Sequence, residues 1–399
     1  DRVEEVETHD PLRVLEVLGH LGDREGRGVR REDALGLDDC LDLGPDGLLD
    51  RHLLEDRLDD RVDTGEVVGR QAREERENLL LRPGATRARG AGNRAVAEDP
   101  DPERTCFERD RDRIVHSTSF RRLAGKTQVV VHPTDHQRTR LTHALEVAQV
   151  ARSIAAGIGA NITLADAMAL GHDCGHGPGG HASEQAFDAF IPEGFDHGPW
   201  GADVSLASLN LCAETLDGIR NHSWSHPAPG TVEGEIVSFA DRIAYCAHDL
   251  EDAIKAGIVT VKELPQVVTE VAGTDRRTQL SVFIRCVIDT TCATGRVGMS
   301  ADVAEALAAL RAFNYERIYT RPESLGQAEA VVEVLHGLVA YYQGHIDQVP
   351  TEFLETDADR IHQVVAYVGG MTDQFAFSHA AELLGWDRRR PPRGMGRGF

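Results

Sequence analysis

The chain has 399 residues and a formal net charge of −23 at pH 7, with a pI of about 5.2. Such an excess of negative charge excludes proteins that bind nucleic acid or anionic membranes through bulk electrostatic attraction, so any phosphate ligand must be met by local basic groups or a metal ion. The seven cysteines form no CxxC pair and no apolar run reaches the roughly 18 residues of a membrane span, so we expect a cytoplasmic protein without disulfides or membrane contact.

Residues 1–100 differ from the rest of the chain in composition. Up to Cys106 there is no Lys, Ser, Ile, Met, Phe, Tyr or Trp, whereas all of these types occur afterwards. Leu, Val and Ala alone lack the aromatic and β-branched volume of a packed core. Three interpretations fit: a regulatory extension, a disordered tail, or a translation of GC-rich DNA upstream of the true start. We favour the last, and predict that residues 1–100 are disordered or not part of the native protein.

From residue 101 onward the spacing of apolar residues predicts an all-α fold. His143, Val147, Val150, Ile154 and Ile158 follow one another at offsets of four, seven, eleven and fifteen, and so share one face of a helix. Further helices are predicted at 164–173, 237–254, 278–292, 302–319, 325–346 and 358–377. The best strand signal is QVVVH at 128–132.

The stretch GHDCGHGPGGHASE at 171–184 holds three histidines, two acids and five glycines. His172 and Asp173 come at the end of a predicted helix, and they need partners from elsewhere to bind an ion. His143 lies on an apolar helix face, and Asp241 lies in an apolar helix where a buried carboxylate requires a cation or hydrogen-bond donors. Each residue alone has an ordinary explanation as a cap, core histidine or ion pair. Together they form a mixed N/O set that suits Mn, Mg, Fe, Co or Ni.

Three segments of the sequence resemble a known family. RLTHALEVAQVAR, GHDCGHGPGGHASE and SFADRIAYCAHDLEDAI, in this order, are similar to the HD-domain superfamily and, within it, to the deoxynucleoside triphosphate triphosphohydrolases, the dGTPase-like proteins. The preceding FERDRDRIVHSTSFRRLAGKTQVV resembles the N-terminal signature of that family. The resemblance implies an HD-domain helical bundle with additional C-terminal helices over 101–385, followed by a basic flexible tail at 386–399.

The resemblance also implies roles for individual residues. A divalent metal ion would be held by His143, His172, Asp173 and Asp241. His181 and Glu184 would form the catalytic pair. Substrate would be bound by Arg140 and His176 at the phosphates, by Tyr245 and Asp249 at the deoxyribose, and by Gln128 at its 3′-hydroxyl. Their spacing of four and eight independently places Asp241, Tyr245 and Asp249 on one helical face. Lys126 and Arg242 are further basic candidates, and for Lys126 an ordinary structural role is as good an interpretation.

The glycine loop departs from the family pattern. The family commonly has GHPPFGH where this chain has GHGPGGH, so Gly179 stands in the place of an aromatic residue. We expect the glycines to let the loop fold over phosphates and bring His181 toward the metal ligands. We also expect the missing ring to loosen the loop. The following FDHGPWG keeps His197 but lacks the Asn and Gln that usually come next.

The function implied by the resemblance is metal-dependent hydrolysis of a deoxynucleoside triphosphate to a deoxynucleoside and inorganic triphosphate. One alternative is an HD phosphohydrolase acting on a nucleoside monophosphate, a cyclic dinucleotide or a ppGpp-like nucleotide. Another is a nucleotide sensor or single-stranded nucleic-acid-binding module with weak catalysis. The resemblance further implies a homo-oligomer, often a hexamer, with a nucleotide activator between subunits.

Overall fold

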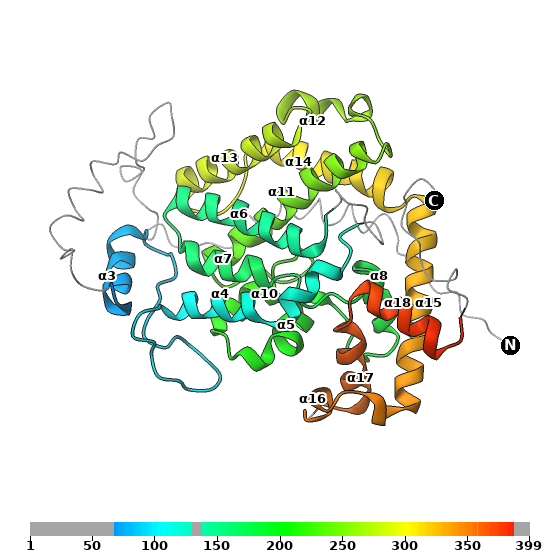
Figure 1. The fold of residues 1–399 in the computed structure, drawn as a ribbon. Helices are drawn as coiled ribbons and strands as arrows, with labels where there is room; N and C mark the ends of the chain where they lie inside the picture. Colours follow the sequence, from blue (N-terminus) through cyan, green and yellow to red (C-terminus); the bar gives the residue numbers. More distant parts are fainter. Residues whose placement is uncertain (1–67, 130–137, 357, 387–399) are drawn as a thin grey trace. The chain divides into compact units, whose positions relative to one another are not determined.

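The computed structural model describes residues 68–129, 138–356 and 358–386 (Figure 1). Within these ranges the chain is helical, with two isolated backbone bridges and no strand, which confirms the predicted all-α fold. The predicted strand at 128–132 is not formed at Gln128 and Val129, and its last three residues lie outside the described residues. No helix in this part of the chain combines the length and apolar character needed to cross a membrane.

The helices fall into two groups according to the core beside which they lie, not according to their order in the chain. The first group comprises α3 (Arg70–Leu80), α4 (Cys106–His116), α5 (Thr118–Arg122), α6 (Arg140–Ile158), α7 (Ile162–Gly171), α10 (Ala213–Arg220), α11 (Val232–Lys255), α12 (Gln266–Val271), α13 (Arg276–Thr294) and α14 (Ala301–Asn314). The second comprises α8 (His181–Asp188), α9 (His197–Trp200), α15 (Pro322–Gly344), α16 (Thr351–Leu354), α17 (Arg360–Gly369) and α18 (Asp373–Leu383). The helices after α14 are the predicted additional C-terminal helices.

The first core is built where α6 packs against α7 and α11. Helix α6 ends at Gly159, which adopts a left-handed φ of 71° that a residue without a Cβ reaches at least cost. Helix α7 then starts at once, because the Asn161 side chain accepts hydrogen bonds from the backbone N–H groups of Thr163 and Leu164. This short turn brings the N-terminus of α6 and the C-terminus of α7 to the same end of the core.

The second core is formed where α8 packs on α15, and α15 packs on α17 and α18 (Figure 1). Phe187 from α8, Val331 and Leu335 from α15 and Val365 from α17 are fully or almost fully buried there. The residues in 171–181 connect α7 of the first core to α8 of the second. The glycine loop predicted from the sequence therefore joins two separately packed groups of helices.

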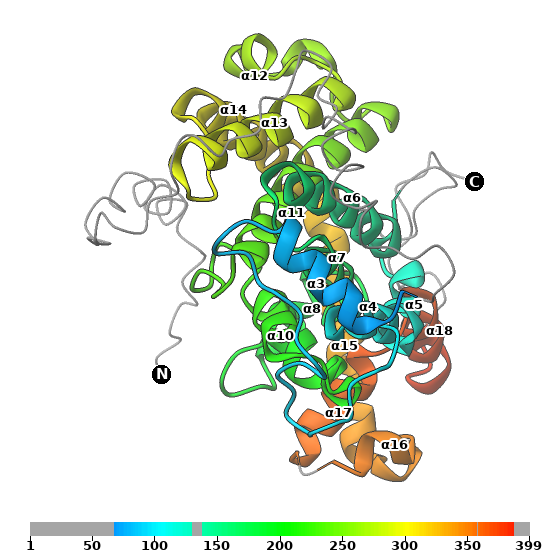
Figure 2. The same cartoon turned by 90° about the vertical axis from the view of Figure 1, so that its left-hand side faces the viewer.

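Residues 68–100 pack against the first core, with α3 beside α4 (Figure 2). Arg94 donates to Asp110 at 2.6 Å, and both side chains are at most 1% exposed. Glu233 of α11 accepts hydrogen bonds from the backbone N–H and hydroxyl of Thr86. The predicted boundary at residue 100 thus differs from the structure, because polar contacts distant in sequence, rather than apolar volume, hold this segment. Residues 1–67 lie outside the described residues, and the prediction for them stays a prediction.

Candidate metal centre and acid-base pair

The four predicted metal ligands converge at the end of the first core. His143 lies in the first turn of α6, His172 and Asp173 follow α7, and Asp241 lies in the middle of α11. His143 Nε2 is 3.1 Å from Asp241 Oδ1. His172 Nε2 is 3.4 Å from Asp173 Oδ1 and 3.6 Å from Asp241 Oδ1. Residues 98 positions apart along the chain are therefore within ligand distance of one another.

These side chains fit a divalent cation. His172 Nδ1 bonds the carbonyl oxygen of Ala169 at 2.6 Å, which turns Nε2 toward the two carboxylates. That Nε2 is buried and finds no hydrogen-bond partner within the described ranges, which is costly unless another group satisfies it. Burial alone would raise the pKa of Asp241, but the hydrogen bond from His143 and the nearby imidazole of His172 hold it well below its usual value. Two imidazoles and two ionised carboxylates are a suitable donor set for Mn²⁺, Mg²⁺, Fe²⁺, Co²⁺ or Ni²⁺.

Arg140 has hydrogen-bonding capacity directed into the site. Its Nη1 donates to Asp173 Oδ2 at 2.8 Å, and the whole residue is 1% exposed. Its Nε and Nη2 are buried without an acceptor in the described part of the chain. A Cβ built on Gly180 would lie 2.7 Å from Nη2, so the glycine loop passes directly over the guanidinium. A buried guanidinium with two unpartnered nitrogens is suited to binding an anion such as phosphate.

The predicted catalytic pair lies on α8. His181 Nδ1 is 3.4 Å from Glu184 Oε2, and the His181 side chain is exposed. Burial alone would raise the pKa of Glu184, but hydrogen bonds from His181 and from His197 lower it. The hydrogen bond to Glu184 raises the pKa of His181 above its usual value. The pair is therefore shifted toward an ionised Glu184 and a protonated His181.

Three more histidines complete the cluster. His197 Nδ1 is 2.5 Å from Glu184 Oε1, and its ring stacks on His176 with centroids 3.7 Å apart. Its Nε2 is 3.1 Å from His222 Nε2. Burial, followed by the charge of Arg140, holds the pKa of His176 well below its usual value, so this ring is neutral. His222 was not predicted, because it follows α10 in a segment without any periodic or spaced motif.

The glycine loop is closely packed, which corrects the expectation that it is loosened. Gly179 and Gly180 have φ values of 76° and 64°. A Cβ on Gly179 would lie 2.5 Å from Val331 Cγ1, so the buried Val331 fills the space beside the loop. The Gly179 N–H also donates to Asp373 at 2.8 Å. The missing aromatic ring is compensated by a side chain from α15.

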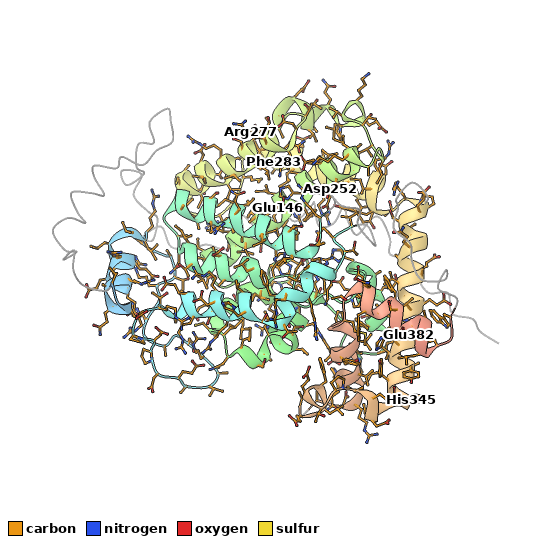
Figure 3. All side chains as sticks on the ribbon, in the orientation of Figure 1. Glu146, Asp252, Arg277, Phe283, His345 and Glu382 are labelled. Atoms are coloured by element: carbon orange, nitrogen blue, oxygen red, sulfur yellow. The ribbon has the colours of Figure 1, made fainter. Side chains whose placement is uncertain are left out.

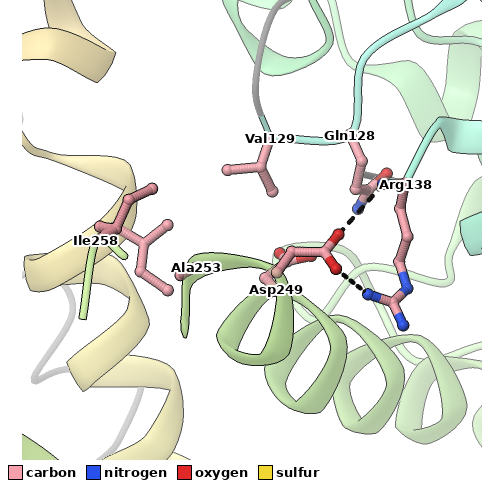
Figure 4. Close-up of a pocket in the computed structure, with 8 residues that line it drawn as sticks. Gln128, Val129, Arg138, Asp249, Ala253 and Ile258 are labelled. Atoms are coloured by element: carbon pink, nitrogen blue, oxygen red, sulfur yellow. Dashed lines mark hydrogen bonds and ion pairs between the residues drawn. The ribbon is translucent and has the colours of Figure 1, made fainter. Parts of the chain in front are cut away.

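A small pocket along α11 brings two predicted sugar contacts together. Gln128 and Arg138 lie on one side, Ile258 on the other, and Asp249 between them (Figure 4). The remaining lining residues are Val129, Asp252, Ala253 and Ile318. Arg138 is fixed by Glu146, Glu251 and Asp252, and Figure 3 marks Glu146 on α6 and Asp252 on α11.

Tyr245 and the two further basic candidates have other partners. The Tyr245 hydroxyl accepts a hydrogen bond from Arg311 Nε at 2.9 Å. Lys126 is buried, and its Nζ donates to the carbonyl oxygens of His176 and Gly369. Arg242 lies over the Trp224 ring, 3.5 Å from its centroid. Because Lys126 donates to two backbone carbonyl oxygens, its role here is structural and not that of a phosphate ligand.

Known families match both groups of helices. The HD domain matches residues 140–246, and the phosphohydrolase-associated domain matches residues 297–382. A deoxyguanosinetriphosphate triphosphohydrolase-like protein of Caldanaerobacter subterraneus subsp. tengcongensis is 39% identical over 324 residues, covering 79% of this chain and 95% of that protein. A protein of the same name from Clostridium perfringens is 39% identical over 295 residues, covering 70% and 86%. A crystal structure of a hypothetical protein from Aquifex aeolicus aligns over 70% of this chain and 69% of that one, with 18% identity and a TM-score of 0.41.

Replacing Asp173 tests the metal centre without any assay of activity. Asp173→Ala removes one predicted ligand and leaves Arg140 buried without its counter-charge, so we expect bound metal to fall to near zero and stability to drop by about 3–5 kcal/mol. Metal content after loading with Mn²⁺ is measured by mass spectrometry. Asp241→Asn serves where Asp173→Ala does not fold, and Asp289→Ala, an exposed acid on α13, is the control. Metal content equal to that of the unmutated protein in both site variants would contradict the assignment.

Asp249 should make stability depend on pH. Burial raises its pKa from 3.8 to about 6, opposed by the Tyr319 hydroxyl at 2.5 Å. A raised folded pKa contributes stability at low pH that is lost as pH rises from about 4 through about 6. Asp249→Asn, which mimics the neutral acid, should therefore stabilise the protein by about 1–3 kcal/mol at pH 7 and by much less near pH 4. Urea unfolding at both pH values, with Asp289→Asn as control, measures this. A loss of stability at pH 7 in Asp249→Asn would contradict this prediction.

Proposed function

This chain belongs to the HD-domain family of deoxyguanosinetriphosphate triphosphohydrolase-like proteins, and we propose that it hydrolyses deoxynucleoside triphosphates to a deoxynucleoside and inorganic triphosphate. The observation that carries the proposal is the place of Arg140. Its two unpartnered buried nitrogens lie between the metal ligands and the glycine loop. A polyphosphate placed there has a cation site on one side and the acid-base pair on the other.

The phosphate chain would be bound by this protein's own donors. Arg140 contributes Nε and Nη2, while its Nη1 stays bonded to Asp173. The neutral His176 has Nε2 3.3 Å from Asp173 Oδ1, while its buried Nδ1 has no hydrogen-bond partner in the described ranges, so this side of the ring would face a phosphate oxygen. His143, His172, Asp173 and Asp241 would hold a divalent cation, which would supply Lewis-acid polarisation of the α-phosphoryl group. Because the protein as a whole is acidic, these local groups must offset the charge of the substrate.

The sugar would occupy the pocket beside α11. Gln128 and Asp249 line it from two different parts of the chain. An amide and a carboxyl group can both hydrogen-bond a sugar hydroxyl. Tyr245 is one turn from Asp249, and its hydroxyl is held by Arg311, so its ring rather than its hydroxyl would face the deoxyribose.

His181 would act as the general acid. Its raised pKa favours the protonated form near neutral pH, and Glu184 orients it through Nδ1. As a water oxygen bonds to the α-phosphorus, the bond from phosphorus to the 5′-oxygen breaks, and His181 would give its proton to that oxygen. The proton displaced from the water would leave to solvent, from which His181 would be reprotonated. Glu184 is itself held by His197, which keeps the carboxylate aimed at His181. His197 thus joins the predicted pair as a third member.

Assembly as a homo-oligomer with a nucleotide activator stays a prediction from the resemblance. The alternative substrates, a nucleoside monophosphate, a cyclic dinucleotide or a ppGpp-like nucleotide, would use the same metal ligands. They differ in product, because only attack at the α-phosphorus of a triphosphate releases inorganic triphosphate. The sensor alternative, with or without single-stranded nucleic acid, predicts binding without turnover.

Product analysis is the direct test. The Mn²⁺-loaded protein is incubated with each deoxynucleoside triphosphate singly and in mixtures, and products are separated by anion exchange. We expect deoxynucleoside and inorganic triphosphate in equal amounts, because a sugar in the pocket and phosphates on Arg140 would put the α-phosphorus beside the predicted metal ligands. Orthophosphate or pyrophosphate as the first product would contradict the proposal.

His181→Ala is the matched variant for this assay. It removes the proton donor while leaving all four predicted metal ligands in place, so metal content should be unchanged and turnover should fall by about 10²–10⁴-fold. His336→Ala, on α15 and bonded to a backbone carbonyl of α8 at 3.0 Å, is a control for loss of an imidazole nearby. Full turnover in His181→Ala would remove His181 from the mechanism.

A further inference from the structure

Two backbone segments of the candidate site donate hydrogen bonds to one carboxylate, Asp373, which is not among the predicted site residues. Asp373, the first residue of α18, is 4% exposed. Its Oδ2 accepts a hydrogen bond from the backbone N–H of Thr127 at 2.9 Å. Its Oδ1 accepts one from the backbone N–H of Gly179 at 2.8 Å. Each oxygen of a single side chain thus holds a different segment of backbone.

Both segments carry residues that the proposed reaction needs. Thr127 directly precedes Gln128, which lines the pocket. Gly179 lies two residues before His181, at the point where the loop turns with positive φ. A change in the position of Asp373 would therefore move a predicted sugar contact and the predicted proton donor together.

The corner between α17 and α18 holds these segments in other ways. Lys126 Nζ donates to the carbonyl oxygen of Gly369 at the end of α17 and also to that of His176 in the loop. A Cβ on Gly125 would lie 2.8 Å from Thr372 Cγ2, so the chain before Lys126 passes against the start of α18. Residues 369–373, between α17 and α18, therefore contact both the 125–128 segment and the glycine loop.

Asp373 also lies between the two cores. Leu123 and the metal-binding helices belong to the first core, whereas Ala376 and Phe377 of α18 belong to the second, as does Phe187 of α8. Apolar packing joins the residues within each group. The two hydrogen bonds to Asp373 add a polar link between a segment beside the first core and the loop that enters α8.

We propose that Asp373 is a positioning residue for the reaction, holding Gln128 and His181 in register across the two cores. The inference rests on the proposed function for its kinetic part. Its structural part, that one carboxylate fixes both segments, does not depend on any substrate. In Asp373→Asn one acceptor oxygen becomes an NH₂ donor facing a backbone N–H, so one of the two bonds is lost and replaced by a repulsive contact.

The first test follows backbone amides by hydrogen exchange in the protein without substrate. In Asp373→Asn we expect faster exchange in the segment whose backbone N–H then faces the NH₂ group, in peptides that contain either Thr127 or Gly179, with metal content unchanged. Asp373→Glu, which keeps the charge but moves the carboxylate by one methylene group, serves if the first variant does not fold. Unchanged exchange at both segments would overturn the proposal.

The second test uses kinetics. A displacement of about 1 Å at reacting groups can cost about 10²-fold in rate, so we expect kcat of Asp373→Asn to fall by roughly 10–100-fold. The preference for a 2′-deoxynucleoside triphosphate over its 2′,3′-dideoxy analogue should also shrink, because Gln128 no longer holds its place. A general loss of stability would not change that preference.

Two controls separate positioning from stability. Val365→Ala creates a cavity in the second core without touching either segment, and it should lower the unfolding temperature while leaving the deoxy-to-dideoxy preference intact. Asp359→Asn alters another acid at a helix N-terminus, and it should change neither the unfolding temperature nor the deoxy-to-dideoxy preference. Equal loss of preference in Val365→Ala would overturn the proposal. If the unmutated protein hydrolyses no deoxynucleoside triphosphate, the proposed function fails, and amide exchange alone decides the role of Asp373.

Discussion

The site depends on one buried charge, the carboxylate of Asp173. It is 2% exposed, with Arg140 Nη1 at 2.8 Å, His176 Nε2 at 3.3 Å and His172 Nε2 at 3.4 Å. Burial alone would raise its pKa, but the charge of Arg140 holds it well below its usual value. An ionised carboxylate in this position is stable only while its partners stay in place. The start of α6, the end of α7 and the glycine loop are therefore fixed relative to one another.

The candidate site is divided between the two cores. The predicted metal ligands lie on α6 and α11 and directly after α7, and these helices share one set of buried apolar residues, while His181 and Glu184 lie on α8, which packs on α15. Each half can be well ordered by its own packing. The chemistry requires both halves in register, and the polar contacts of Asp373 and Lys126 cross between them. Hydrogen bonds of Asp373 and Lys126 thus link the segments that lie beside the two cores.

Much of this arrangement could be predicted from local sequence patterns. The face that begins with His143 and the acid Asp241 within an apolar helix are visible because helical periodicity is local. The same periodicity placed Tyr245 on the face of α11 with Asp249, but it could not show that Arg311 holds the Tyr245 hydroxyl. The packing of Val331 against Gly179 was equally hidden, since it joins residues more than a hundred positions apart.

Other parts carried no usable signal in one sequence. His222 and Asp373 each act through one or two long-range hydrogen bonds and belong to no spaced motif recognised beforehand. Residues 68–100 were set apart on composition, which reports on apolar volume but not on buried ion pairs such as Arg94 with Asp110. Composition therefore underestimates order wherever charged side chains do the packing.

The most direct test of the central claim is the fate of the water oxygen. Hydrolysis of a deoxynucleoside triphosphate is run in ¹⁸O-labelled water with the Mn²⁺-loaded protein, and both products are analysed by mass spectrometry. Attack at the α-phosphorus predicts one labelled oxygen in inorganic triphosphate and an unlabelled deoxynucleoside. Label in the deoxynucleoside 5′-hydroxyl, or label released only in orthophosphate, would contradict the proposed function.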